Sequence, residues 1–473
     1  MKTRTHRKTI LSVFLATVVL CYSACAPAST SNNTEEAQLI EKGRYLSTAA
    51  DCMACHTTPG GSPFAGGLAI DTPVGPVVST NITPSRTAGI GNYTLEQFTQ
   101  VLRRGVRADG QNLYPAMPYT SYAKISDDDI RAMYAYFMHG VKAVDTPAPR
   151  TSLPFPFNIR LAMAAWNLLF LDATPYHTAA DKSPQWNRGA YLVNGLAHCS
   201  TCHTPRNLMM AEDSTRFLGG AYIGPWYAPN ITSDVDSGIG SWSVAEIVQY
   251  LSSGHNRKAQ AAGPMMEAID ISLRHLNHDD LQAIATYLKT IPAVHDPADS
   301  RPAHEWGKAP DAQDQVRGTP WPANPDQLTG PQLYDAHCAT CHQARGQGSF
   351  EGGLPALFGN AATGRLQTNN LVLTILTGIH LRSQNSGTIM PGFANIMSDQ
   401  QITTLSNYLL TTFGNPQARV TLEQVSKLRN GQPTHAHPIN LLLAARIGMG
   451  VAVIFALWLI SLILRRYRQH HTN

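Results

Sequence analysis

The chain has 473 residues, of which 43% are hydrophobic and 14% charged. This composition excludes an intrinsically disordered chain, and the length is enough for about three domains of roughly 100–150 residues each. The formal net charge of +4 comes from the two ends. Four basic residues lie within the first 25 positions and three after position 464, and removing these seven charges leaves the body at −3. A nucleic-acid-binding protein carries a positive face on its folded body, so this class is excluded.

The first segment, 1–28, has the pattern of an export signal. Basic residues precede an apolar run of 11 residues, Ile10–Leu20, and small residues follow. Cleavage after Ala26 or Ala28 fits this pattern, while a lipoprotein-like site before Cys25 keeps lipidation open. The apolar run is short for a retained membrane helix, which needs about 20 residues. We therefore predict a signal peptide at 1–28.

Three C-x-x-C-H motifs follow, at 52–56, 199–203 and 338–342. This spacing is the attachment signature of c-type haem: two thiols bind one edge of the porphyrin and the adjacent histidine binds its iron. A zinc ribbon needs two cysteine pairs close together, but these pairs lie about 140 residues apart. A thioredoxin-like pair needs a βαβ context and no following histidine. We predict three covalently bound haem c groups, held by Cys52, Cys55, His56, Cys199, Cys202, His203, Cys338, Cys341 and His342.

A methionine lies at a similar distance after each motif and is the candidate for the sixth iron ligand. Met117 and Met390 follow their motif histidines by 61 and 48 residues, and each precedes a proline, which fixes the loop backbone. In the second domain Met265 and Met266 are both candidates, and we prefer Met265. A thioether ligand raises the haem potential. The predicted iron ligands are His56, Met117, His203, Met265, His342 and Met390. The alternatives in the second domain are His255, His275 and His278.

The sequence around the motifs repeats three times. A helix-like segment precedes each motif, and an amphipathic helix with an acidic start follows each methionine, at 128–137, 279–288 and 399–409. Crossing helices of this kind form the frame of a small cytochrome c fold. We predict an all-α protein with three tandem small cytochrome c domains plus one C-terminal transmembrane helix. The domains are predicted at 35–145, 183–295 and 327–415.

The first two domains resemble each other more than the third. The triplets Asn-Ile-Thr and Gly-Ile-Gly within 81–91 recur within 230–240, offset by 149. This block is interpreted either as a flap over a haem edge or as a turn beside capped helices. Pro59 and Pro205 follow the motif histidines by three and two residues. Their carbonyl groups are candidate acceptors for the free ring nitrogen of the ligand histidine.

Two linkers join the domains. The first, 146–182, contains the strongly apolar stretch Phe155–Phe170, which is predicted to strap the first domain to the second or to a partner. A quinone pocket is the less favoured interpretation of this stretch. The second linker, 296–326, is polar and rich in proline.

The last segment contains 18 consecutive uncharged residues, Ile447–Leu464, after a juxtamembrane segment at 416–440. This length is enough to span a bilayer, and the positive-inside rule assigns the three arginines that follow to the cytoplasm. We therefore predict a transmembrane helix at 441–464 and a cytoplasmic tail at 465–473. The haem domains are then expected on the periplasmic side of the cytoplasmic (inner) membrane. A buried core helix is the alternative.

Five stretches together resemble one known family. They are 81–84, 89–98, 113–119, 155–160 and 390–393, and the likeness runs from about residue 37 to 415. The chain is similar to the three-haem cytochrome c subunits of membrane-bound bacterial dehydrogenases, which oxidise alcohols, gluconate, sorbitol, fructose or aldehydes. The resemblance implies a separate catalytic dehydrogenase subunit, of the flavin, pyrroloquinoline quinone or molybdenum type, as electron donor. It also implies ubiquinone as acceptor and the cytoplasmic membrane as location.

The chain itself has the parts of an electron carrier only. It contains no G-x-G-x-x-G fingerprint opening a βαβ unit and no nucleophile elbow, so we predict no catalytic residues and no substrate oxidation of its own. Two other functions remain open. One is an electron carrier to a periplasmic oxidase or reductase, and the other is a haem enzyme or sensor with one open iron site.

Overall fold

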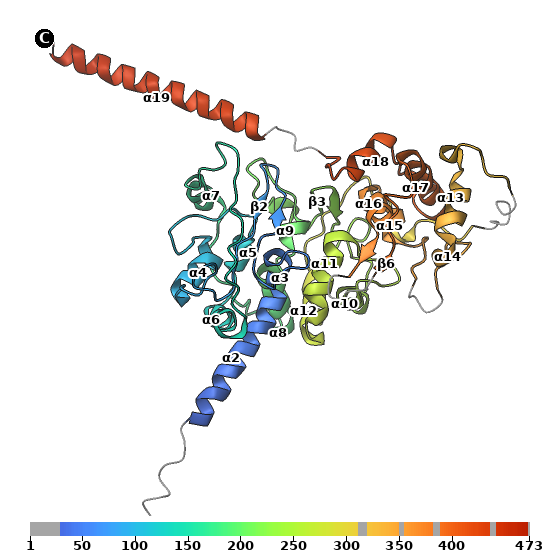
Figure 1. The fold of residues 1–473 in the computed structure, drawn as a ribbon, viewed down its shortest axis with the longest axis horizontal. Coiled ribbons are helices and arrows are strands. Elements are labelled where there is room, and N and C mark those ends of the chain that lie inside the picture. The colour runs from blue at the N-terminus through green and yellow to red at the C-terminus, as the bar shows by residue number, and fades with distance from the viewer. Residues whose placement is uncertain (1–28, 311–318, 350–353, 382–387, 436–440, 472–473) are drawn as a thin grey trace, which may run out of the picture.

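The computed structural model describes residues 29–310, 319–349, 354–381, 388–435 and 441–471, and these are mostly helical (Figure 1). The predicted signal peptide at 1–28, including Cys25, lies outside the described residues. The few strands in the described part form three antiparallel hairpins of two strands each, β1–β2, β3–β4 and β5–β6.

The first predicted domain and the linker after it contain α2 (Ser29–Ala49), α3 (Cys52–His56), β1 (Ala69–Ile70), β2 (Val77–Val78), α4 (Leu95–Arg104), α5 (Tyr119–Tyr122), α6 (Asp127–Ala135), the π-helix η1 (Tyr136–Gly140) and α7 (Ala162–Phe170). The second contains α8 (Pro184–Tyr191), the π-helix η2 (Leu192–Leu196), α9 (Ser200–His203), η3 (Ser214–Arg216), β3 (Ala221–Ile223), β4 (Trp226–Ala228), α10 (Val244–Ser253), α11 (Gly263–Ile271), η4 (Leu273–His275) and α12 (His278–Leu288).

The linker and the third domain contain η5 (Ala303–Glu305), η6 (Pro325–Gln327), α13 (Gly330–His337), α14 (Ala339–His342), α15 (Ala361–Gly364), α16 (Asn369–Thr377), β5 (Ile379–His380), β6 (Thr388–Met390), α17 (Asp399–Phe413) and α18 (Leu422–Arg429). The predicted helices after each methionine are present as α6, α12 and α17. Each starts at a polar N-cap whose side chain accepts a backbone N–H, and acidic residues in the first turn favour the helix dipole.

A glycine marks the helix crossing of each repeat. Gly43 in α2, Gly189 in α8 and Gly330 in α13 each face the last helix of their domain, where a Cβ would clash with a backbone carbonyl or with a tyrosine Cβ. The absent side chain therefore sets how closely the two helices approach. From Gly189 to Cys199 the second domain has one residue more than the first has from Gly43 to Cys52, and the π-helix η2 takes up this insertion.

The first two domains share one core. Their buried apolar side chains form a single continuous cluster, whereas most of the core of the third domain forms a separate cluster. The linker helix α7 adds contacts to both of the first two domains. The Trp166 indole donates to the Met209 carbonyl at 2.9 Å, and Asn167 accepts from the Tyr119 hydroxyl at 2.8 Å. The apolar stretch thus straps the first domain to the second. Its outer face, with Leu161 and Leu168, is exposed.

Two equivalent contacts join the first two domains, each from a tyrosine of one domain to an aspartate of the other. The Tyr45 hydroxyl of the first domain donates to Asp280 of the second at 2.6 Å, and the Tyr191 hydroxyl of the second donates to Asp129 of the first at 2.6 Å. Both aspartates hold the third position of the last helix in their domain. The sequence pattern alone did not predict these two contacts, although the equivalent tyrosines and aspartates lie in the repeated segments.

Each of these buried aspartates also pairs with a cation from its own domain. Lys42 contacts Asp129 at 2.6 Å, and Arg188 binds Asp280 through two N–H groups at 2.7 Å each. Burial raises the pKa of Asp280, but hydrogen bonds from Arg188 and Tyr45 outweigh it and hold the pKa below its ordinary 3.8. Burial and the bond to the carboxylate raise the pKa of Tyr45 to about 12. This contact therefore keeps one protonation state from mildly acidic to alkaline pH.

The C-terminal segment forms α19 (Leu441–His471), which projects from the body in Figure 1. The sequence pattern predicts a transmembrane helix at 441–464. A span needs about 20 predominantly apolar residues in one helix. Within the described part of the chain, no helix is long and apolar enough to cross a membrane. The prediction of a C-terminal transmembrane helix, and with it that part of the fold class, is wrong.

Candidate haem-attachment sites

The three cysteine pairs lie on or beside the short helices α3, α9 and α14, and none of these six cysteines is joined in a disulfide bond. Five are half-buried and Cys341 is exposed. Burial raises the pKa of Cys199 to about 12 and of Cys338 to about 12. Burial therefore disfavours the thiolate form of these two cysteines. Among the described residues, no group of three or more His, Cys, Asp or Glu side chains is arranged to hold a metal ion.

Each motif histidine is oriented by a backbone carbonyl. The Nδ1 atom of His56 lies 2.6 Å from the Thr80 oxygen, and Nδ1 of His203 lies 2.6 Å from the Pro229 oxygen. Nδ1 of His342 lies 3.0 Å from the carbonyl oxygen of Pro355. Because a carbonyl only accepts, Nδ1 carries the proton and Nε2 keeps its lone pair for iron. Burial lowers the pKa of all three imidazoles, opposed by these hydrogen bonds, so each stays neutral.

These acceptors differ from the prolines considered in the sequence. Pro59 and Pro205 follow their histidines in the chain, but the acceptors are Thr80 and Pro229, which return from the next loop. The proline hypothesis is therefore wrong for the two residues proposed. Local spacing could not predict these partners. They lie 24 and 26 residues after their histidines in the chain, and only the path of the loop brings them next to the motif.

The repeated Asn-Ile-Thr block explains how these carbonyls are held. Thr80 and Pro229 directly precede Asn81 and Asn230. The Asn81 side chain accepts from the Thr83 amide at 2.9 Å and donates to the Val144 carbonyl near the end of the domain, and Asn230 makes the equivalent pair of contacts. Both asparagines are buried. The block is thus a rigid turn followed by a capped helix, α4 or α10, and it fixes the residue that orients the ligand histidine.

The three candidate methionine ligands are half-buried. Met117 precedes α5, Met265 lies in α11 and Met390 ends β6. Met266 is different, because its side chain is only 2% exposed and its sulfur packs against Gly254. This packing favours Met265 as the ligand. The iron-ligand assignments stay predictions.

The first and second motifs lie close together. The Tyr122 hydroxyl donates to the Ala50 carbonyl, two residues before Cys52, at 2.6 Å. The Tyr122 ring also packs edge-on against His198, which directly precedes Cys199, with ring centroids 5.6 Å apart. In addition, α11 of the second domain packs against α3 of the first. The structure therefore brings these two attachment sites to one domain interface.

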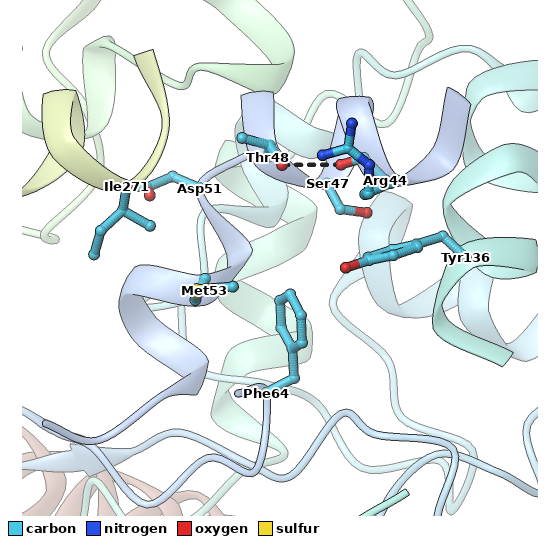
Figure 2. Close-up of a pocket in the computed structure, with 8 residues that line it drawn as sticks. All are labelled: Arg44, Ser47, Thr48, Asp51, Met53, Phe64, Tyr136 and Ile271. Atoms are coloured by element: carbon cyan, nitrogen blue, oxygen red, sulfur yellow. Dashed lines mark hydrogen bonds between the residues drawn. The ribbon is translucent and has the colours of Figure 1, made fainter. Parts of the chain in front are cut away.

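A small recess lies beside the first motif (Figure 2). Its volume is about 130 Å³, and Met53, Phe64 and Tyr136 line it together with polar residues of α2. The Ser47 hydroxyl is buried at this recess and has no hydrogen-bond partner in the described part of the chain. Ligand pockets usually measure about 300–1,000 Å³, so this recess is too small for a porphyrin.

Comparison with known proteins agrees with the arrangement of these sites. The family model for cytochrome c matches three parts of the chain, residues 40–140, 187–292 and 328–413. Each match contains one C-x-x-C-H motif, one carbonyl-oriented histidine and one candidate methionine. The domain boundaries predicted from the sequence stay predictions, because the matched ranges do not test where each domain begins and ends.

Full-length relatives extend the match. The chain is 46% identical to the fructose dehydrogenase cytochrome subunit of Gluconobacter japonicus over 403 residues, 83% of either chain. It is 38% identical to the gluconate 2-dehydrogenase cytochrome c subunit of Pantoea cypripedii over 92% of this chain and 97% of that one. It is also 38% identical to the cytochrome c subunit of alcohol dehydrogenase (quinone) of Gluconobacter oxydans, over 85% and 84%.

The cysteine pairs, which form no disulfide, and the lone pairs on Nε2 of the adjacent histidines fit covalently bound haem, and the family model matches the same segments. The chain belongs to the cytochrome c family and, within it, to the cytochrome c subunits of dehydrogenases. It is thus a protein that binds haem c covalently and serves electron transfer from a dehydrogenase.

Proposed function

We propose that this chain carries three covalent haem c groups and passes electrons from a catalytic dehydrogenase subunit to ubiquinone. The haem group supplies one-electron chemistry, and the protein sets its position and potential. The observation that carries the proposal is the threefold recurrence of one arrangement: a cysteine pair followed by a neutral histidine that a carbonyl holds through Nδ1.

The chain's own residues have distinct tasks in this function. The cysteines would hold each haem covalently, and Thr80, Pro229 and Pro355 hold the histidine rings through Nδ1, which would leave Nε2 available to bind iron. Met117, Met265 and Met390 would each supply a second protein ligand. The Tyr45–Asp280 and Tyr191–Asp129 contacts keep the first two domains in one relative position, which would also fix the distance between the groups bound to them.

The catalytic partner and the electron acceptor are proposed from the names of the relatives, and the location from the pattern at 1–28. Proteins named as subunits of fructose, gluconate and alcohol dehydrogenases support a catalytic subunit that oxidises a sugar, sugar acid or alcohol. A flavin, pyrroloquinoline quinone or molybdenum cofactor in that subunit is proposed from the family resemblance. The quinone in the name of one relative supports ubiquinone as acceptor. The basic and apolar pattern at 1–28 supports export, and the chain then works at the outer side of the cytoplasmic membrane.

The test is purification of the tagged full-length chain from its own host, followed by anaerobic addition of candidate substrates. We expect a large catalytic subunit to copurify, its substrate to reduce the haem bands, and ubiquinone-1 to reoxidise them. Reduction of the haem by substrate without a second subunit would contradict the proposal. So would reoxidation by a soluble oxidase or reductase but not by the quinone.

A further inference from the structure

Met117 lies in a tight turn whose backbone is held by two tyrosines. The Met117 amide donates to the Tyr114 carbonyl at 3.2 Å, and the Met117 carbonyl accepts from the Tyr119 amide at 2.8 Å. Met117 itself is half-buried and packs against the core that the first two domains share. The position of the Met117 backbone therefore depends on how these two tyrosines are held.

The hydroxyl groups of both tyrosines bind the linker that follows the first domain. Tyr114 donates to the Phe157 carbonyl at 2.8 Å, and Tyr119 donates to the Asn167 side chain in α7 at 2.8 Å. These acceptors lie 43 and 48 residues after the two tyrosines in the chain. The linker thus contacts the turn on both sides of Met117.

Two linker side chains add further contacts to the same loop. Arg160 donates to the Asn112 carbonyl at 2.9 Å, and its guanidinium lies over the Tyr114 ring, 4.6 Å from the centroid. Asn167 also donates to the Arg104 carbonyl at the end of α4 at 3.1 Å. A shift of the loop relative to the linker would therefore break several contacts at once.

The contact around Tyr119 is closed to water. Tyr119 is 0% exposed, and it packs in one buried cluster with Trp166 of α7 and Ala211 of the second domain. Its ring lies so close to Gly105 that an added Cβ there would clash with it. Because water cannot replace a lost partner at a buried hydroxyl, the bond to Asn167 fixes the position of this ring. The linker thereby connects the Met117 turn to the second domain as well.

The other two candidate methionines lie in regular elements. Met265 is part of α11, and Met390 is part of β6, where it pairs with Ile379 of β5. Regular hydrogen bonding fixes the backbone in such elements. Met117 instead lies in a loop just before α5, so its position depends more on contacts from outside its own segment.

We propose that the linker positions Met117 for the first haem, by holding the turn through Tyr114 and Tyr119. The inference rests on the proposed function, in which Met117 is an iron ligand. Residues that touch a ligand rather than the metal orient that ligand, and a thioether ligand raises the haem potential. Arg160 and Asn167 are then positioning residues, and the potential of the first haem depends on contacts made by the linker.

The test measures carbon monoxide binding, the red absorption band of methionine-ligated ferric haem, and the midpoint potentials of the haem-loaded full-length chain. Tyr114→Phe and Tyr119→Phe each remove one hydroxyl and keep the ring. We expect each variant, and the double variant more strongly, to bind carbon monoxide at one reduced haem, to weaken the red band and to lower one of the three potentials. Tyr176→Phe is the matched control, because the Tyr176 hydroxyl of the same linker donates to Asn187 of the second domain at 2.7 Å. Met117→His assigns the affected step and is expected to lower the same potential.

Two results would overturn the proposal. One is a double variant whose carbon monoxide binding, red band and potentials match those of Tyr176→Phe. The other is a shift in a step that Met117→His leaves in place. If Tyr119→Phe loses haem, Tyr114→Phe decides alone: carbon monoxide binding supports the proposal, and a match with Tyr176→Phe overturns it. A haem count below three in the unchanged chain would contradict the proposed function instead, so the two failures are distinguishable.

Discussion

Replacing Met265 by histidine is expected to lower one of the three haem midpoint potentials by a few tenths of a volt. A thioether ligand raises the potential relative to imidazole, and axial ligands span roughly 0.8 V across haem proteins. Met265 is half-buried in α11, the helix that packs against the first attachment motif. The measurement is a potentiometric titration of the haem absorbance bands in the full-length chain.

The neighbouring methionine provides the control for this experiment. Met266 is 2% exposed and packs against Gly254, so Met266→Leu conserves its volume and is expected to leave all three potentials in place. A fall in potential for Met266→Leu with no change for Met265→His would reverse the ligand assignment. Carbon monoxide binding to the reduced unchanged chain would instead reveal an iron with no methionine ligand.

Replacing Gly189 by valine is expected to destabilise the second domain by about 3 kcal/mol or more, at the upper end of overpacking effects. A Cβ at this position would clash with the Ala283 carbonyl oxygen. A backbone carbonyl cannot rotate away as a side chain can, so α8 and α12 must separate. Because the first two domains share one core, they are expected to melt together, and for a unit of that size the loss corresponds to a fall in Tm of about 6–12 °C. Thermal melting of the haem-loaded chain, followed by circular dichroism, measures it.

Gly448→Val serves as the comparison for this substitution. Gly448 is also a helical glycine, in α19, but an added Cβ there meets no atom within 4 Å. The same loss of glycine is therefore expected to leave the melting of the haem domains unchanged. Equal melting curves for Gly189→Val and the unchanged chain would show that this crossing does not need a glycine.

Local sequence patterns were enough for the motifs and for the helices after each methionine. The C-x-x-C-H spacing is set by the porphyrin edge, and the helix starts are set by caps such as Ser126 and Asn277, both of which depend on residues close in the chain. The glycines at the helix crossings could also have been predicted from the sequence, since Gly43 and Gly189 occupy equivalent positions in the repeated segments.

Contacts between distant segments could not be predicted in this way. The carbonyl acceptors Thr80 and Pro229 depend on a loop that returns to the motif, and the reciprocal Tyr45–Asp280 contact depends on how two domains pack. At the C-terminal segment the sequence pattern predicted a feature that the structure does not have. The run of uncharged residues predicts a membrane-spanning helix, but no helix of the described residues is long and apolar enough to cross a membrane.

The central claim is that each of the three cysteine pairs holds a porphyrin through covalent bonds. The most direct measurement is the intact mass of the mature chain after acid–acetone treatment, made in a host that can attach c-type haem. We expect a mass that exceeds the polypeptide by three haem groups, all of which survive extraction. A colourless chain of polypeptide mass alone, or one whose haem is removed by the solvent, would contradict the account.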